Sequence, residues 1–302
     1  MKSIPFGKPI IKKNINKVLE KIIKSGLLVH GPYQKKFERS FSEINKSKFV
    51  TTVSNCTSGM LLYYFCKKLK KNDEVLMPAT THVATANAIE ATGAKPIFVD
   101  VNIQDGNINL DEAKKKITKN TRGIVVVHYL GFPVDIEKLS YFKKKKLFIV
   151  EDCALSLLSS FKNKYVGNFG DCASFSFYPV KHITTGEGGM VILNNKKDYQ
   201  KILSLKSFGY FHPYKKNRAR YNYDVKDCGL NFRLNEISCA LGEYQLKEIK
   251  KIKEIRKKNF FYAKKLFNKI DGISVLEKKD SKIDPNYYAI SIIFKEKSKQ
   301  FR

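Results

Sequence analysis

The sequence predicts an α/β fold built around a mostly parallel β-sheet. Short apolar runs rich in Val, Ile and Phe alternate along the chain with amphipathic stretches of helical period. Each amphipathic stretch is short enough to serve as the crossover between two parallel neighbouring strands. The repeated strand-helix-strand pattern therefore favours the α/β class.

The apolar runs predict the strands, and the segments between them predict the helices. We expect the first strands at residues 49–54, 74–77, 95–99, 123–127 and 147–150. The intervening helices are expected at residues 57–69, 81–92, 110–117 and 135–142. A further strand and a further helix are expected at residues 190–193 and 199–207. Open α/β sheets bind ligands beyond the carboxyl ends of their strands, so the residues after each strand are the candidate site residues.

The C-terminal part of the chain has a different pattern. A long lysine-rich helix is expected at residues 234–266, followed by strands at 273–276 and 287–294. With 302 residues and 43% hydrophobic content, the chain can bury one large core and a second small one. We predict a large domain over residues 1–244 and a small α+β domain over residues 245–302. Because the sequence stops directly after the second strand, we expect the small domain to be incomplete.

The formal net charge of +29 is the most prominent compositional feature. Such a charge suits a phosphate-rich partner, such as nucleic acid, a membrane surface or a nucleotide-linked substrate. The lysines, however, are spread along the whole chain, as expected for solvated helix faces. No RNA-binding motif, zinc-finger spacing or basic zipper accompanies them. We therefore expect no nucleic-acid partner and keep a nucleic-acid-binding protein as a minor alternative.

Cysteine usage and the N-terminus indicate the compartment. The six cysteines form no Cys-x-x-Cys pair and have no histidine spacing suited to zinc, so neither a disulfide framework nor a metal site is predicted. The N-terminus lacks an apolar stretch of signal-peptide length, and no run approaches the ~20 apolar residues that span a bilayer. We expect a cytoplasmic protein with reduced thiols and no membrane span.

A lone lysine, Lys181, lies between a strand-like stretch and a glycine-rich turn in the run SFSFYPVKHITTGEGG at residues 174–189. This is a suitable position for the lysine of a pyridoxal phosphate enzyme. That cofactor requires an amine, a carboxylate for its ring nitrogen, a phosphate site and a flat group against the ring. Asp152 ends the run LFIVED, where a carboxylate could stay ionised beside a protonated ring nitrogen. The alternative for Asp152 is a helix cap.

The segment NCTSG at residues 55–59 could hold the phosphate, because it follows a strand and begins a helix. Its hydroxyl groups, and another before Lys181, are the candidate ligands: Thr57, Ser58 and Ser176. His82 begins the next helix and is the candidate for the flat group. Each has an ordinary alternative, since Ser and Thr cap helices and lone histidines are more often structural than functional.

Together these segments resemble the DegT/DnrJ family of sugar aminotransferases, which are fold-type I pyridoxal phosphate enzymes that act on nucleotide-linked keto-sugars. The resembling segments occur in the same order over nearly the whole chain. They are SNCTSG (54–59), PATTHVATAN (78–87), PIFVD (96–100), VHYLG (127–131), VED (150–152), FSFYPVKHITTGEGG (175–189) and GLNFRLNE (229–236). The resemblance implies a three-layer fold-type I domain with a mostly parallel sheet, plus a smaller C-terminal domain.

The resemblance also implies a role for each candidate residue. Lys181 would form the internal aldimine with pyridoxal 5'-phosphate and move protons at the reacting carbon, while Asp152 would hold the pyridinium nitrogen. His82 occupies the ring-stacking position. The phosphate-binding positions are matched by Thr57, Ser58 and Ser176. Asn231 matches an asparagine that reaches the phosphate from the neighbouring subunit, so a homodimer with shared active sites is implied.

The chain also departs from the family pattern. Leu155 stands where the family often has a glutamine that contacts the cofactor's phenolic oxygen. Cys56 stands where a smaller residue is more usual, and residues 207–214 differ from the family as well. A dehydratase branch has histidine at the aldimine position, so Lys181 favours transamination, although His182 is adjacent.

The leading prediction is an aminotransferase that moves an amino group, from glutamate, onto a keto carbon of a nucleotide-linked sugar. The reaction would use pyridoxal phosphate in a ping-pong cycle. Two alternatives remain open from the sequence. One is a silent or truncated relative that binds a sugar nucleotide without turnover, and the other is a pyridoxal phosphate-dependent sugar dehydratase.

Overall fold

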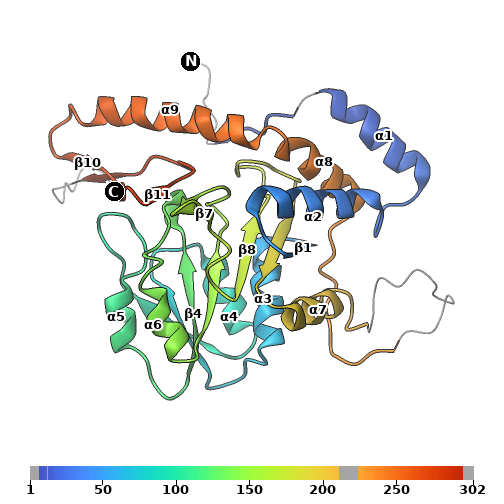
Figure 1. The fold of residues 1–302 in the computed structure, drawn as a ribbon, viewed down its shortest axis with the longest axis horizontal. Coiled ribbons are helices and arrows are strands. Elements are labelled where there is room, and N and C mark those ends of the chain that lie inside the picture. Colours follow the sequence, from blue (N-terminus) through green and yellow to red (C-terminus); the bar gives the residue numbers. More distant parts are fainter. Residues whose placement is uncertain (1–6, 12, 211–223, 295–302) are drawn as a thin grey trace.

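The structure is a computed structural model that describes residues 7–11, 13–210 and 224–294. Its centre is a seven-stranded sheet (Figure 1). The strands are β1 (Phe49–Val53), β2 (Glu74–Pro78), β3 (Lys95–Val99), β4 (Thr121–Val127), β5 (Phe148–Asp152), β8 (Cys172–Ser176) and β9 (Gly189–Leu193). They lie in the order β1-β9-β8-β5-β4-β2-β3. The pairings from β8 to β3 are parallel, and β9 runs antiparallel to both β8 and β1, so the predicted mostly parallel sheet is confirmed.

Helices cover both faces of the sheet and give three layers. One face carries α3 (Cys56–Cys66), α4 (Val83–Glu90) and α7 (Lys196–Leu205). The other face carries α2 (Pro32–Asn45), α5 (Leu110–Lys115), α6 (Leu139–Lys144) and α8 (Glu236–Leu246). In β4 the alternation of strand side chains divides these cores, because Val125 packs with α3 and α4 while Ile124 and Val126 pack with α5 and α6. The apolar runs are therefore buried on both sides, as in other parallel sheets.

The single long helix predicted at residues 234–266 is wrong. The chain forms two helices, α8 and α9 (Ile249–Phe267), and at their junction the Glu248 amide bonds to the Gln245 carbonyl oxygen, three residues back. Neither Gly nor Pro marks this break. α8 buries Cys239 and Leu246 in a cluster that also contains Ile249 at the start of α9, whereas Phe260, further along α9, lies in a separate cluster.

The predicted C-terminal strands exist but are shorter than expected. β10 (Ile273–Val275) and β12 (Ile292–Phe294) pair antiparallel. The second prediction began at Tyr287, whose φ of 54° lies outside the extended region, so no strand can start there. Phe260, Leu276 and Tyr287 form a cluster with Phe132 of the larger part. The domain boundary near residue 245 stays a prediction, and residues 211–214 and 295–302, which earlier predictions included, lie outside the described residues.

Several elements of the structure were not predicted. They are η1 (Lys13–Ile15), α1 (Asn16–Ser25), α2, η2 (Tyr129–Gly131) and the small sheet of β6 (Ser160–Phe161), β7 (Lys164–Tyr165) and β11 (Ile283–Asp284). In α2 the spacing of Phe37 and Phe41, both fully buried, could have indicated a helix. The two-residue strands carry no periodicity that could be recognised in the sequence.

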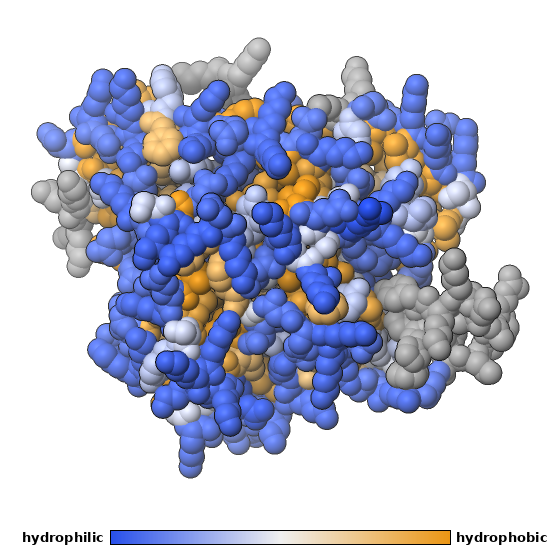
Figure 2. All heavy atoms as spheres, viewed as in Figure 1, coloured by the Kyte–Doolittle hydropathy of each residue, from blue (hydrophilic) through white to orange (hydrophobic). Residues whose placement is uncertain are grey.

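The surface reflects the composition. The face drawn in Figure 2 is covered mostly by hydrophilic side chains, with apolar ones visible between them. Hydrophilic side chains spread in this way agree with the prediction that the lysines lie on solvated helix faces. Within residues 7–11, 13–210 and 224–294, none of the helices is both long enough and apolar enough to cross a bilayer.

A buried carboxylate joins α8 to the start of α2. Glu236 is 1% exposed, and its two oxygens accept from the amides of Tyr33 (2.7 Å) and Gln34 (2.9 Å) in the first turn of α2. Gly31 allows this approach, because a Cβ there would lie 2.4 Å from Glu236 Oε2. The carboxylate therefore caps a helix that comes two hundred residues earlier in the chain, at the positive end of the helix dipole.

Glu236→Gln is expected to lower the free energy of unfolding by about 2 kcal/mol, because an amide replaces a charge-assisted acceptor for buried donors. Urea denaturation measures the change. The matched control is Glu254→Gln on the exposed side of α9, which should change stability by less than about 0.5 kcal/mol. Equal effects of the two substitutions would contradict the capping role.

Candidate active site

A cavity of about 730 Å³ opens where β5 and β8 end and where α3 and α4 begin. Six of the seven predicted site residues line it: Thr57, Ser58, His82, Asp152, Ser176 and Lys181. The seventh, Asn231, is exposed outside the cavity and pairs with Ser207 in a short β-bridge. The position agrees with the rule that open α/β sheets bind ligands beyond the carboxyl ends of their strands.

Asp152 is the last residue of β5 and is 5% exposed. Its Oδ1 accepts from the Ala154 amide at 3.0 Å, and its Oδ2 accepts from Thr85 Oγ1 at 2.9 Å. The Cys56 thiol lies 3.9 Å from Oδ1 and is protonated, because burial, followed by the Asp152 charge, raises its pKa well above the usual range. Asp152 is thus a buried carboxylate whose orientation is fixed on both oxygens.

Lys181 lies in the turn between β8 and β9, where its amide bonds to the Tyr178 carbonyl oxygen at 2.9 Å. Its Nζ lies 5.3 Å from the centre of the Tyr288 ring. Burial lowers the pKa of Lys181, and the negative charge of Asp152 opposes this shift without cancelling it. A lowered pKa increases the neutral fraction of the amine, which is the form that acts as nucleophile and base.

The neighbouring His182 does not share this position. It is buried away from the cavity, and its Nε2 lies 3.3 Å from the Asn286 carbonyl oxygen. Burial lowers the pKa of His182 to about 3, so its ring is neutral. The side chain that faces the cavity is therefore lysine, and the adjacent histidine has a structural contact.

The start of α3 forms the floor of the expected phosphate site. Asn55 caps the helix, since its Oδ1 accepts from the Ser58 amide at 2.8 Å and from the Ser58 hydroxyl at 2.9 Å. The cap is therefore Asn55, and neither Thr57 nor Ser58. Gly59 brings α3 close to the sheet, because a Cβ there would lie 2.4 Å from Ser174 Oγ. The positive end of this eleven-residue helix faces the cavity.

His82 contacts both the cavity and the first turn of α4. It lines the cavity, and it is the N-cap of α4, because its Nδ1 accepts from the Ala84 amide at 3.2 Å. The cap fixes the imidazole at the cavity wall. Ser176 also lines the cavity, and its Oγ accepts from the Tyr178 amide at 3.4 Å.

Sequence reasoning missed Tyr288, which also lines the cavity. Tyr288 is held by the segment before it, because the fully buried Asn286 donates through Nδ2 to the carbonyl oxygens of Leu155 (3.0 Å) and Leu157 (2.9 Å). On the other side, Arg256 of α9 donates to the Tyr288 carbonyl oxygen at 2.6 Å. No local pattern could have indicated that this distant segment completes the cavity.

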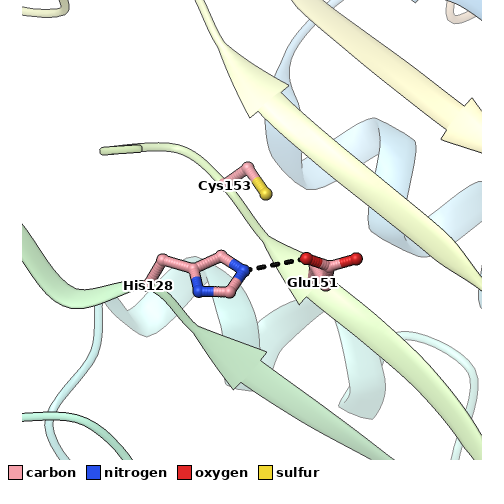
Figure 3. A group of neighbouring side chains, drawn as sticks. All are labelled: His128, Glu151 and Cys153. Carbon is pink, nitrogen blue, oxygen red and sulfur yellow. Dashed lines mark hydrogen bonds and ion pairs between the residues drawn. The ribbon is translucent and has the colours of Figure 1, made fainter. Parts of the chain in front are cut away.

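A second cluster of ionisable groups lies in the core beside the site. His128, Glu151 and Cys153 have ligand atoms within 4.8 Å of one another (Figure 3). The His128 Nε2 donates to Glu151 at 2.9 Å, since its Nδ1 accepts from the Val134 amide at 3.1 Å. Both ring nitrogens are therefore in use, and burial raises the pKa of the Cys153 thiol far above the range in which thiolates bind metals.

Glu151 is the centre of this cluster. Besides His128, its oxygens accept from the amides of Gly167 (2.8 Å), Phe169 (2.8 Å) and Gly170 (2.6 Å). Burial favours the protonated form, yet these donors outweigh it and the pKa of Glu151 is lowered. The group therefore holds a loop to β5 through charge-assisted hydrogen bonds. We interpret it as a structural network, and the sequence prediction of no metal stays a prediction.

Glu151→Gln is expected to destabilise the fold by about 3 kcal/mol at neutral pH, because buried donors lose their ionised acceptor. A lowered folded pKa gives a stabilising contribution that is complete above the unfolded value near 4.5 and is lost as the pH falls through the folded value. Urea denaturation from pH 7 to pH 3 should therefore show the two proteins converging in acid. A difference that is independent of pH would contradict this interpretation.

The comparison with known proteins agrees with this geometry. The sequence pattern of the DegT/DnrJ/EryC1/StrS aminotransferase family matches residues 9–302. The chain belongs to this family. The assignment made from the motifs is thereby confirmed, and with it the prediction of an aminotransferase.

Individual members of the family are similar over almost the whole chain. GDP-perosamine synthase of Escherichia coli O157:H7 is 35% identical over 97% of this chain and 78% of that protein. UDP-4-amino-4,6-dideoxy-N-acetyl-beta-L-altrosamine transaminase of Campylobacter jejuni is 33% identical over 92% of this chain and 73% of that protein. Helicobacter pylori PseC, an aminotransferase involved in the biosynthesis of pseudoaminic acid, has a TM-score of 0.89 at 29% identity over 99% of this chain and 79% of that one. This likeness confirms the aminotransferase fold.

Proposed function

We propose that this DegT/DnrJ family member is a pyridoxal 5'-phosphate-dependent aminotransferase. Its substrate would be a nucleotide-linked keto-sugar, and its amino donor would be glutamate. The observation that supports this most is the joint position of Lys181 and Asp152. An amine of lowered pKa and a buried carboxylate line one cavity at the carboxyl end of the sheet, although twenty-nine residues separate them in the sequence.

The donor set fits the cofactor. Lys181 offers an amine, and Asp152 offers a carboxylate that a protonated ring nitrogen would neutralise. The positive end of α3 offers a site for phosphate, together with three hydroxyls on the cavity wall: Thr57, Ser58 and Ser176. His82 offers a flat side chain on the same wall. The cavity also lies within the range of volumes usual for cofactor sites.

The bound cofactor would supply an electron sink for the carbon that loses its proton. The protein residues would do the rest. The Lys181 amine would take the proton from the α-carbon of the amino donor and give it to the C4′ position of the cofactor. Its lowered pKa allows it to act as this base. Asp152 would hold the ring nitrogen in its charged form, and His82 would keep the ring flat. Tyr288 would close the cavity over Lys181 and exclude water.

The substrate class follows from two supports. Two similar relatives are named for a GDP-linked and a UDP-linked sugar. The chain is also strongly basic, which favours encounter with a nucleotide diphosphate. Transamination is preferred over dehydration because lysine, and not histidine, faces the cavity at position 181. The exposed position of Asn231 supports a homodimer in which it reaches the partner's phosphate site.

One departure favours a second candidate, a relative that binds its ligands without turnover. Leu155 lines the cavity where the family often has a glutamine, and a leucine side chain cannot donate to the phenolic oxygen of the cofactor. Such a protein would retain the cofactor but would not react with the amino donor.

The absorption spectrum of the purified protein with pyridoxal phosphate distinguishes these candidates. A visible band that bleaches with glutamate, and a borohydride-reduced label mapped to Lys181, would support the aminotransferase. A stable band that no amino donor changes would favour the silent relative. An intact fold without any band or label would refute the aminotransferase and leave only a silent relative that binds a sugar nucleotide without the cofactor.

A further inference from the structure

A chain of hydrogen bonds runs through the first turn of α4 and ends on Asp152. Thr85 Oγ1 donates to Asp152 Oδ2 over 2.9 Å, and Thr81 Oγ1 lies 2.9 Å from Thr85 Oγ1. Thr85 is fully buried, whereas Thr81 lines the cavity. Two hydroxyl groups therefore connect the cavity wall to the carboxylate at the end of β5.

The chemistry of the groups fixes the direction of this chain. An ionised carboxylate only accepts hydrogen bonds, so the single proton of the Thr85 hydroxyl points to Asp152. The Thr85 hydroxyl has no second proton. In the contact between the two threonines, Thr81 must therefore be the donor and Thr85 the acceptor. The Asp152 Oδ1 is held separately by the Ala154 amide at 3.0 Å. Across the described residues, Thr85 is the sole protein donor to Oδ2.

The same helical turn also positions His82. The imidazole caps α4 through its contact with the Ala84 amide, and Thr85 follows three residues later. Further along, Ala88 and Ile89 anchor the helix in the buried cluster that it shares with α3. Since an anchored helix moves as one body, its first turn fixes both the imidazole and the carboxylate relative to the cavity.

We propose that Thr85 is a positioning residue, which holds the Asp152 carboxylate in the orientation that a protonated ring nitrogen requires, with Thr81 as the outer link. The inference rests on the proposed function, because it takes pyridoxal phosphate as the ligand. Without the Thr85 hydroxyl, Asp152 Oδ2 loses its donor, and the carboxylate can rotate about the Cβ–Cγ bond. A carboxylate that is already oriented binds the ring nitrogen without the entropy cost of stopping this rotation.

The test compares Thr85→Val, which has nearly the same shape but no hydroxyl, with Thr85→Ser, which keeps the hydroxyl. Two probes are used: pyridoxal phosphate, and its analogue in which carbon replaces the ring nitrogen. Dissociation constants are measured by titration of protein fluorescence. Thr85→Val should weaken binding of pyridoxal phosphate about tenfold and change binding of the analogue less than about twofold. Thr85→Ser should retain most of the wild-type preference for the nitrogen-containing ring.

The outer link predicts a graded effect. Thr81→Val leaves the direct hydrogen bond from Thr85 to Asp152 in place. Its preference for pyridoxal phosphate over the analogue should therefore fall less than that of Thr85→Val. Circular dichroism and thermal unfolding check that each variant folds, and Thr85→Ala replaces Thr85→Val if valine prevents folding. Turnover gives a second readout, because kcat should fall while the KM for the sugar substrate stays unchanged.

Equal weakening of both probes by Thr85→Val would overturn the inference, because it would indicate a packing role. An unchanged preference of Thr85→Val for pyridoxal phosphate over the analogue would also overturn the inference. If the wild-type protein still binds pyridoxal phosphate on Lys181, the proposed function would stand. A wild-type protein that does not bind pyridoxal phosphate at all would overturn the proposed function and this inference together.

Discussion

Lys181→Ala is expected to lower turnover at least about 10³-fold and to abolish borohydride-dependent labelling of the chain by pyridoxal phosphate. Lys181 supplies the only amine on the cavity wall that the structure describes. Alanine therefore removes both the nucleophile that holds the cofactor and the base that moves the proton. Because burial lowers the pKa of Lys181, labelling of the wild-type protein should extend to lower pH than labelling of an exposed lysine.

The measurement is single-turnover absorption with a keto-sugar substrate, together with mass mapping of the labelled peptide. Lys250→Ala, on the exposed side of α9, is the matched control and should keep wild-type labelling and turnover. Chemical rescue gives a second check, because a small free amine should restore part of the activity of Lys181→Ala. Normal turnover by Lys181→Ala would contradict the proposed mechanism.

Asp152→Asn is expected to reduce kcat by about 10³-fold, or about 4 kcal/mol in activation free energy, while cofactor binding falls less. Asparagine keeps the shape of the side chain and can still contact the Ala154 amide through its oxygen. It carries no negative charge, however, and cannot hold a ring nitrogen in its protonated form. The electron sink therefore weakens, while the contacts to the phosphate and to the ring face remain.

The test separates binding from chemistry. The dissociation constant of pyridoxal phosphate is measured by fluorescence, and kcat by steady-state kinetics with glutamate. Asp271→Asn, at an exposed turn, controls for the loss of one negative charge and should leave both values unchanged. A carbon-for-nitrogen analogue adds a diagnostic, because wild type and Asp152→Asn should bind it equally well. A strong difference between them with the analogue would contradict a contact to the ring nitrogen.

The local sequence was sufficient for the central sheet and for most of the cavity wall. The strands could be predicted because buried parallel strands are short continuous apolar runs, and the structure moves their ends by only a few residues. Asp152 could be placed because it ends a predicted strand, and parallel strands present their carboxyl ends on one edge of the sheet. Ser176 was chosen because it lies five residues before Lys181, and the structure shows that it ends β8. Site residues at the ends of strands can therefore be predicted before the fold is known.

Other features depend on contacts between distant segments. The predicted long helix divides at Glu248, and Phe260 of its second part packs in a different cluster from Cys239 and Leu246 of its first part. Tyr288 lines the cavity in a segment that Asn286 holds through hydrogen bonds to carbonyl groups about 130 residues earlier in the chain. Neither residue belongs to a motif that marks its role.

The sequence by itself determined the class of fold, the strand-end residues and the family. The tertiary structure alone decided that His182 turns away from the cavity, that Asn55 caps α3, and that Thr85 completes the contacts of Asp152. The physical reason is the range of the interactions. Hydrophobic period and strand-end position are properties of neighbouring residues, whereas burial and the choice of hydrogen-bond partner are decided only when remote segments pack together.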